Sequence, residues 1–359
     1  MNRVVIIGII TMLCALPPNG YAQVKYDFSP VNNKINGWLD SAYYPGAALM
    51  IVKDGRVIFE KCYGQYTPET EVYIASAGKW LAAAALAAVT EDGRLSWDDP
   101  VNKWLPEFTD IKGTATLRQL FSHTSGFPGY QPANRPPDNY SSLRVSVSFI
   151  QPLPADTMPG RVFHYGGLGM QVAGRMAEVA TGKDWETIFQ EKIAGPLGMT
   201  HTFFTPVDTT PGHSPMLGGG ARTTLGDYIR FLEMFANRGM YKGKRVLSEQ
   251  SVQEMTASQT GHAFVPADNF LRLARGVPYP GVYGLGLWRE EVDSSGAATL
   301  ITSPSWAGAY PWIDCRNNVC GFFIAHVNPV TAAKHHFSSF YASYVLPMMV
   351  REVLKTKSL

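Results

Sequence analysis

Residues 71–93 read EVYIASAGKWLAAAALAAVTEDG, and two kinds of local structure meet within this stretch. Its first five residues favour an extended chain, whereas the Ala- and Leu-rich run from Trp80 to Val89 contains no Pro or Gly and predicts a buried helix. Gly93 is the kind of residue that ends such a helix. Ser76 therefore stands where an extended segment turns into a helix.

Ser76 and Lys79 form a Ser-x-x-Lys pattern that occurs once in the chain. Three residues apart, their side chains share one helix face, and the unpaired N–H groups of the helix start favour negative charge there. A lysine in a partly desolvated cleft loses affinity for its proton and can accept that of the serine. A helix-capping serine beside a solvated lysine gives the same pattern, however, and chance supplies about one such match per chain of this length.

The hydrophobic pattern outside this stretch predicts an α+β fold. An apolar run at 47–52 and a β-prone run at 57–60 flank Asp54-Gly55, a strong signal of a hairpin. We expect helices at 117–123, 168–180, 185–193, 225–237 and 341–355, and late strands at 284–291, 298–302, 309–314 and 319–327. The economical packing is one antiparallel sheet built from both chain ends, flanked by the terminal helices, with a helical region inserted in the middle.

The first 22 residues differ in character from the rest. Arg3 precedes an apolar run from Val4 to Leu16, and Gly20-Tyr21-Ala22 follows as a small-residue site. The pattern predicts a secretory signal peptide cleaved before Gln23, because the run is shorter than the roughly 20 apolar residues that span a bilayer. We therefore expect an exported protein, periplasmic or secreted, with no membrane span in the mature chain.

We expect residues 23–359 to form a single domain. Its mixed α/β part comprises about 23–75 and 280–359, and its mainly helical part about 76–279. The 45% hydrophobic content suits a large core, and a net charge of +2 without Lys or Arg clusters argues against a nucleic-acid partner.

Cysteine and histidine usage limits the other chemistries. Cys315 and Cys320 bracket a short turn between two apolar runs, so a disulfide could join the strands of a hairpin, or both thiols could be reduced. Cys62 would be unpaired. The eight histidines include no His-Glu-x-x-His, so we expect no metal or cofactor, and His123 and His164 are interpreted as structural hydrogen-bonders.

Two further motifs support the Ser-Lys pair. Phe163-His164-Tyr165-Gly166-Gly167 precedes an amphipathic helix, and Pro304-Ser305-Trp306-Ala307-Gly308-Ala309 leads into a late strand. With these motifs in order, the chain resembles the serine β-lactamase and penicillin-binding-protein superfamily, in its class C-like branch, and more closely the family VIII carboxylesterases. Secondary landmarks of the resemblance are Leu120-Phe-Ser-His123-Thr-Ser-Gly126, Leu197-Gly-Met199, Gly218-Gly-Gly-Ala-Arg-Thr223 and Tyr283-Gly-Leu-Gly286.

The resemblance implies a β-lactamase/transpeptidase-like fold and a role for each motif residue. Ser76 would be the nucleophile of an acyl-enzyme mechanism and Lys79 its proton acceptor. Tyr165 would relay protons to the leaving group, which needs a cationic neighbour such as Lys79 because a phenol normally titrates near 10. The backbone N–H groups of Ser76 and Ala309 would form the oxyanion hole.

Two departures from the family pattern bear on the substrate. The second motif usually ends in Asn, whose amide contacts an acylamino group, but here it ends in Gly167. The third motif usually begins with a cation that holds the substrate carboxylate, but here Trp306, followed by Ala307 and Gly308, provides an apolar wall. These substrate-binding positions favour a carboxylesterase acting on small or medium neutral esters, and Tyr283, Tyr310 and Trp312 are interpreted as core residues.

Three alternatives remain open at this point. One is a class C-like β-lactamase or DD-peptidase acting on a small amide, and another is a non-catalytic peptidoglycan-binding module on the same fold. The third is an α/β-hydrolase, since residues 74–78 nearly match the Gly-x-Ser-x-Gly elbow. The first Gly of that elbow is missing, and the order of the predicted elements does not fit its alternating strands and helices.

Overall fold

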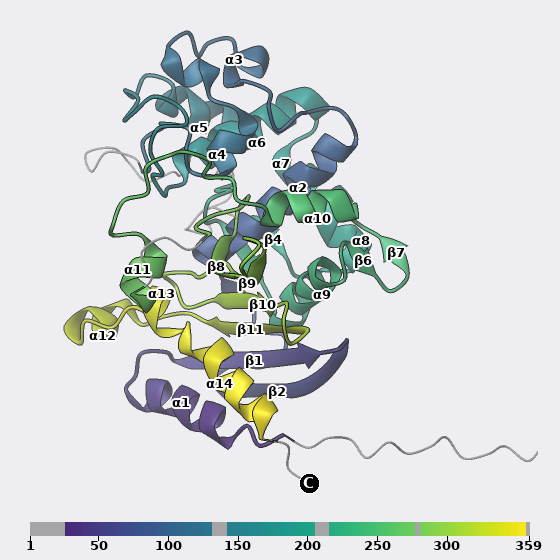
Figure 1. Cartoon of the computed structure of the whole chain (residues 1–359), viewed down its shortest axis with the longest axis vertical. Helices are drawn as coiled ribbons and strands as arrows, with labels where there is room; N and C mark the ends of the chain where they lie inside the picture. Colours follow the sequence, from purple (N-terminus) through teal and green to yellow (C-terminus); the bar gives the residue numbers. More distant parts are fainter. Residues whose placement is uncertain (1–25, 131–141, 205–214, 277–280, 357–359) are drawn as a thin grey trace, which may run out of the picture.

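The computed structural model describes residues 26–130, 142–204, 215–276 and 281–356; the predicted signal peptide lies outside them. A six-stranded antiparallel sheet runs through the molecule in the order β2-β1-β11-β10-β9-β8 (Figure 1). Its strands are β1 (Gly46–Lys53), β2 (Arg56–Gly64), β8 (Trp288–Val292), β9 (Ala298–Thr302), β10 (Tyr310–Asp314) and β11 (Val319–Ala325). The sheet thus combines two strands from near the N-terminus with four from the C-terminal part of the chain, as predicted.

The hairpin between β1 and β2 turns where Asp54-Gly55 predicts it. Lys53 pairs with Arg56, and Asp54 and Gly55 have φ angles of 50° and 71°. Two consecutive left-handed residues make the tight turn that matches the twist of paired strands.

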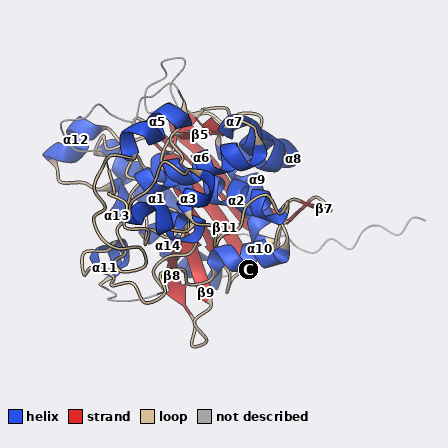
Figure 2. Cartoon of the chain, turned by 90° about the horizontal axis from the view of Figure 1, so that it is seen from above, coloured by secondary structure: helices blue, strands red, loops and turns tan. Residues whose placement is uncertain are grey.

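The two faces of the sheet carry different layers, because successive residues of a strand point to opposite sides. On one side, Phe323 of β11 lies 5.6 Å, between ring centroids, from Trp38 of α1 (Ser29–Asp40), which packs beside α14 (Val345–Lys355) (Figure 1). On the other side, Phe322 stacks at 4.4 Å on Tyr228 of α9 (Leu225–Ala236). Viewed from above, the strands lie between the helical layers (Figure 2).

Most of the helical part lies on the α9 side of the sheet (Figure 2). Its helices are α2 (Gly78–Glu91), α3 (Val101–Trp104), α4 (Leu117–Phe121), α5 (Leu143–Ile150), α6 (Leu168–Thr181), α7 (Trp185–Phe189), α8 (Gly195–Leu197), α10 (Glu249–Thr256) and α11 (Phe270–Arg275), with 3₁₀ turns η1 (Ala75–Ala77) and η2 (Ile111–Thr114) and the π-helical η3 (Gln190–Ala194). Short strands β3 (Val72–Tyr73), β4 (Phe203–Phe204) and β5 (Ala221–Thr223) form a second sheet, β6 (Met240–Tyr241) and β7 (Lys244–Arg245) a third.

Helix α2 is buried from Gly78 to Val89, which explains its small side chains. Gly286 lies against the carbonyl of Lys79 with a φ of 73°, where a β-carbon would collide with that backbone. Small residues thus allow close approach on several sides of the helix that follows Ser76.

Most of the predicted elements are present, with shifted ends. The predicted helix 185–193 ends as the π-helical η3, and the predicted strand 284–291 begins only at Trp288. The predicted helix 341–355 is divided into α13 (Ser339–Ala342) and α14, after the short α12 (Pro329–Lys334).

Within the described part of the chain, no helix combines the length and apolar character needed to cross a bilayer.

Candidate active site

Ser76 lies in the middle of the 3₁₀ turn η1, between β3 and α2. The preceding Ala75 has a φ of 44°, a left-handed conformation that costs energy for any residue with a β-carbon. Two hydroxyl groups hold the turn in place: Ser303 donates to the carbonyl of Ser76 (3.1 Å), and Tyr228 donates to that of Ala77 (2.7 Å). The strained turn therefore connects the sheet to the start of the buried helix, and Ser76 itself is only 8% exposed.

Lys79 places a buried amine beside the hydroxyl of Ser76. Its side chain is 2% exposed, and its Nζ donates to Ser76 Oγ at 3.0 Å and to the carbonyl of Gly218. Among the described residues, no carboxylate forms an ion pair with it. Burial lowers the pKa of Lys79 to about 7, so a large fraction of this amine is neutral at neutral pH and can accept a proton.

Tyr165 completes the cluster from the loop before α6. The centroid of its ring lies 4.7 Å from Lys79 Nζ. Burial raises the pKa of the Tyr165 phenol well above its usual range, and a hydrogen bond with Ser76 acts in the opposite direction. The phenol therefore keeps its proton at neutral pH. A protonated phenol is compatible with the predicted role of Tyr165 in protonating the leaving group, with Lys79 as the proton acceptor, and both roles stay predictions.

The third motif lies at the start of β10. Gly308 has a φ of 126°, a conformation essentially restricted to glycine, and the N–H of Ser305 donates to the carbonyl of Ala309 at 2.9 Å. Ala307 and Ala309 are buried. The N–H of Ser76 lies within the first turn of a helix, where such groups lack a helical acceptor. The oxyanion hole formed by the N–H groups of Ser76 and Ala309 stays a prediction.

Gly167 and Gly218 face each other across the site, but only one of the two positions has room for a side chain. A β-carbon on Gly218 would lie 2.9 Å from the Cα of Gly167, whereas one on Gly167 would meet only the Cα of Gly218, at 4.0 Å. Gly167 has a φ of −120°, which any residue can adopt. Packing therefore requires glycine at position 218, but does not explain glycine at position 167.

Trp306 forms an exposed rim. It is 51% exposed, and its ring centroid lies 6.3 Å from that of Tyr73 and 6.2 Å from that of His326. These three residues and Arg222 line a pocket of about 420 Å³, in which the Arg222 guanidinium lies 5.8 Å from the Tyr73 ring. Trp306, predicted to be an apolar wall, is thus apolar, but the guanidinium of Arg222 from β5 lies in the same pocket.

The other residues singled out in the sequence are packed in the core or held by hydrogen bonds. Tyr283, Tyr310 and Trp312 are buried, as expected for core residues. His123 is also buried and accepts a hydrogen bond from the N–H of Gly166 at its Nδ1 (3.3 Å). Burial and then the charge of Lys79 lower the pKa of His123 well below its usual value, so its imidazole is neutral. His164, on the surface, pairs with Asp156 at 2.9 Å. Within the described residues, no cluster of potential metal ligands occurs.

Sequence reasoning missed the aromatic residues around Tyr165. Trp288 of β8 stacks on Tyr165 with 5.4 Å between ring centroids, and Phe340 of α13 lies 6.5 Å away. Both residues line a cavity of about 430 Å³ that also touches Phe270 of α11. No spacing in the sequence connects these three positions with Tyr165, because the tertiary fold alone brings them together.

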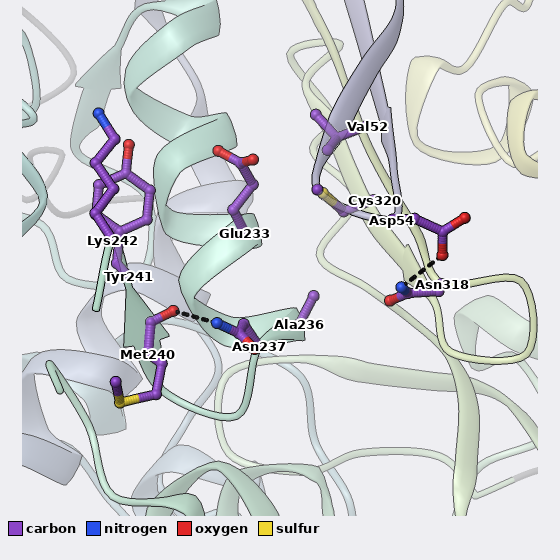
Figure 3. A pocket seen from close by; sticks show the side chains of 11 residues that line it. Val52, Asp54, Glu233, Ala236, Asn237, Met240, Tyr241, Lys242, Asn318 and Cys320 are labelled. Carbon is purple, nitrogen blue, oxygen red and sulfur yellow. Dashed lines mark hydrogen bonds between the residues drawn. The ribbon is translucent and has the colours of Figure 1, made fainter. Parts of the chain in front are cut away.

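Of the two states left open for Cys315 and Cys320, the structure has the reduced one, and Cys62 is free as well. Cys320 pairs with Ile313, so Cys315 lies two residues beyond the cross-strand position, in the turn. Cys320 instead lines a pocket of about 550 Å³ beside α9 (Figure 3). Burial raises the pKa of its thiol above the usual range, so Cys320 lacks the thiolate that a nucleophile needs.

Comparisons with known proteins agree with this fold. The family model described as Beta-lactamase matches residues 31–337. A protein of Bacteroides dorei DSM 17855, described as a "putative beta-lactamase", has a solved structure that is 52% identical, with a TM-score of 0.88 over 92% of this chain and 100% of that one. A family VIII carboxylesterase of known structure is 16% identical, with a TM-score of 0.66 over 88% of this chain and 96% of the other, a likeness of fold.

Two curated relatives differ in how far they match. AmpH of Escherichia coli (strain K12), a D-alanyl-D-alanine-carboxypeptidase/endopeptidase, is 24% identical over 93% of this chain and 94% of its own. PbpX of Bacillus subtilis (strain 168) is 31% identical over 48% of this chain and 44% of its own length. The match with PbpX thus covers about half of this chain and less than half of PbpX.

Proposed function

This chain belongs to the Beta-lactamase family, and we propose that it is a serine hydrolase, specifically a carboxylesterase acting on small or medium neutral esters through Ser76, Lys79 and Tyr165. The fold it shares with a family VIII carboxylesterase is compatible with this proposal. The observation that carries it is Trp306, which offers a half-exposed indole where a cation would hold a substrate carboxylate.

The geometry suggests how the acyl-enzyme would form. Neutral Lys79 accepts the proton of Ser76, and Ser76 Oγ attacks the ester carbonyl. The oxygen of the tetrahedral intermediate receives hydrogen bonds from the N–H groups of Ser76 and Ala309. Tyr165 donates its proton to the departing alkoxide and regains one from Lys79, so that Lys79 is neutral again. Water then attacks the acyl-enzyme while Lys79 accepts one of its protons. Lys79 returns this proton to Ser76 Oγ as the bond to the acyl group breaks, and the carboxylic acid leaves.

Gly167 supports the choice of ester over β-lactam. An Asn side chain there would supply the amide that contacts an acylamino group, and the space around Gly167 would admit a β-carbon. Because packing does not demand glycine, its presence fits a substrate without an acylamino group.

A DD-peptidase is the second candidate, and Arg222 favours it. The guanidinium lies in the pocket beside Trp306, where it could attract a peptide carboxylate. AmpH, which aligns with most of this chain, is a D-alanyl-D-alanine-carboxypeptidase/endopeptidase.

A hydrolysis panel tests the proposal. We expect short-chain p-nitrophenyl esters to be cleaved far faster than nitrocefin or a D-Ala-D-Ala peptide, with Ser76→Ala as the blank. Faster turnover of nitrocefin or of the peptide would reject the carboxylesterase. If the peptide is the better substrate, Arg222→Gln should lower peptide turnover at least about tenfold and leave ester turnover nearly unchanged.

We also propose that the protein is exported, on the sequence of residues 1–22. Sequencing the N-terminus of the protein purified from a cell envelope or culture fraction should give a chain beginning at Gln23. An N-terminus that retains residues 1–22 in that fraction would contradict cleavage.

A further inference from the structure

The cavity of about 430 Å³ beside Tyr165, called here the aromatic pocket, is built mainly from rings. Its aromatic lining residues are Phe163, Tyr165, Phe270, Trp288, Phe340 and Tyr341. Phe163 and Tyr165 come from the loop before α6, and the others from α11, β8 and α13. Three distant segments of the chain therefore combine with this loop to enclose one aromatic space.

The rings pack against one another and leave flat apolar surfaces. Phe270 lies 5.2 Å from Trp288 and 4.6 Å from Phe340, measured between ring centroids. Tyr341 is nearly parallel to Phe270, with an interplanar angle of 14°. Surfaces of this kind bind a planar ring better than a flexible chain of similar size, because ring contacts add to the apolar area that is buried.

Tyr165 connects the aromatic pocket to the reaction. In the proposed mechanism its phenol donates a proton to the leaving alkoxide, so the leaving oxygen must lie within hydrogen-bond distance of it. The group attached to that oxygen then extends alongside Tyr165, which is itself a wall of the pocket. The aromatic pocket therefore lies on the alcohol side of the ester and not on the acyl side.

The polar residues at the pocket disfavour a negatively charged alcohol group. Asp268 lines it, and burial followed by the charge of Asp268 raises the pKa of Tyr341. Asn269 is already engaged: its side chain accepts from the N–H of Leu271 at 3.0 Å and donates to the carbonyl of Pro266 at 3.0 Å. Of the described residues that line the pocket, none is Lys or Arg, and His164, which also lines it, is paired with Asp156 at 2.9 Å.

We propose that the aromatic pocket receives the alcohol part of the substrate, and that the preferred substrates are esters of neutral aromatic alcohols. This inference rests on the proposed esterase function and deepens it by naming the alcohol class. A leaving group that carries a carboxylate, as D-alanine does, would meet Asp268 and aromatic faces, with no Lys or Arg among the described lining residues and with His164 already paired with Asp156.

Three acetate esters test the preference without a large change in the acidity of the alcohol. Benzyl acetate carries a flat ring, cyclohexylmethyl acetate a puckered ring of similar size, and 4-carboxybenzyl acetate a flat ring with a negative charge. We expect kcat/KM to fall about fivefold from the first ester to the second and at least about tenfold from the first to the third.

Variants of Phe340 locate this preference in the pocket. Phe340→Ala should lower kcat/KM for benzyl acetate about tenfold and that for propyl acetate less than twofold. Phe340→Leu, which keeps apolar volume, should give an intermediate loss. The matched control is Phe337→Ala in the same C-terminal stretch, where Phe337 stacks on Tyr43 at 3.9 Å and lies outside the pocket. Melting temperatures establish that each variant is folded.

The possible failures can be told apart. Suppose that the wild type cleaves esters, but that Phe340→Ala and Phe340→Leu lower kcat/KM for benzyl acetate and for propyl acetate by the same factor. The pocket assignment is then wrong, and the esterase proposal stands. If 4-carboxybenzyl acetate is cleaved as well as benzyl acetate, the argument from charge is wrong. If no ester is cleaved while nitrocefin or a D-Ala-D-Ala peptide is, the proposed function fails, and this inference fails with it.

Discussion

Two buried lysines occupy different regions of the helical part, and their surroundings differ in one respect. Lys79, at the start of α2, is 2% exposed and Lys112, in η2, is 1% exposed. Lys112 Nζ forms an ion pair with Asp110 and donates to the carbonyl of Leu153 at 2.7 Å. Within the described part of the chain, Lys79 Nζ hydrogen-bonds only to the hydroxyl of Ser76 and the carbonyl of Gly218, and no carboxylate pairs with it. An ammonium group without a counter-charge binds its proton weakly, so the missing carboxylate is what fits Lys79 for a role as a base.

The largest expected difference between the two lysines is in catalysis. Lys79→Met should lower kcat for ester hydrolysis at least about a thousandfold, because Ser76 then has no proton acceptor. Lys112→Met, an equally drastic change at an equally buried position, should keep kcat within about threefold of the wild-type value. Steady-state kinetics on p-nitrophenyl butyrate would measure both, and a Lys79→Met enzyme with more than a tenth of the activity would contradict the assignment.

The second difference concerns stability against pH. Because the pKa of Lys79 is lowered from 10.5 to about 7 in the folded protein, the unfolded chain binds more protons between these values. The free energy of unfolding of the wild type, relative to Lys79→Met, should therefore rise as pH increases from 7, by at most about 1.4 kcal/mol per pH unit. Urea denaturation at pH 7 and pH 9 measures it, with Ser76→Ala expected to follow the wild type. Parallel curves for wild type and Lys79→Met would refute the lowered pKa.

A third experiment would give Lys79 the kind of neighbour that Lys112 has. The wild-type kcat/KM should rise with pH through about 7 as Lys79 loses its proton. Gly167→Asp adds a carboxylate opposite Gly218, whose carbonyl binds Lys79, and should move this rise upward by about one pH unit. This shift corresponds to a loss of kcat/KM of about ninefold at pH 6 and about fivefold at pH 7. Gly167→Asn has the same shape without the charge and should leave the midpoint in place. Equal midpoints in the Asp and Asn variants would argue against Lys79 as the titrating group.

The smallest expected effect is the structural contribution of Lys112. Lys112→Met removes the donor to the carbonyl of Leu153 and the ion pair with Asp110, which is half-exposed and can be hydrated instead. The loss in the free energy of unfolding should be about 1 to 2 kcal/mol. Denaturation at pH 7 measures it, and Asp110→Asn, as the matched comparison, should cost more, because it leaves the buried ammonium of Lys112 without a counter-charge. A loss above about 4 kcal/mol would mean that the ion pair is effectively buried.

Local signals were sufficient to place Ser76 beside Lys79, whose roles as nucleophile and base stay predictions. The spacing of Ser76 and Lys79 predicted their contact, because a single helical turn determines it. The Asp54-Gly55 turn and the ends of β9 were also predicted correctly, because residues close together in the sequence determine them. Tyr165 was found through its motif, although the rise of its pKa required knowledge of how deeply it is buried.

Long-range packing explains what the sequence could not reveal. Nothing near Trp288 or Phe340 in the sequence marks them as neighbours of Tyr165. The Arg222 beside Trp306 comes from β5, which pairs with β3, so a cation enters a pocket that the third motif alone would make apolar. The sequence could not decide the redox state of Cys315 and Cys320, because strand register, which the spacing of two cysteines does not reveal, determines which residues can be joined.

The pairing of β1 with β11, for instance Leu49 with Phe323, has a consequence for how the molecule is made. A ribosome releases the β1–β2 hairpin long before it has synthesised β10 and β11, so one edge of β1 has no partner for most of translation. Closing so long a loop also slows folding. Because Ala309 leads directly into β10, the proposed oxyanion hole can be assembled only once the last strands exist. Incomplete translation products would then be inactive and would expose an unpaired strand edge to chaperones or proteases.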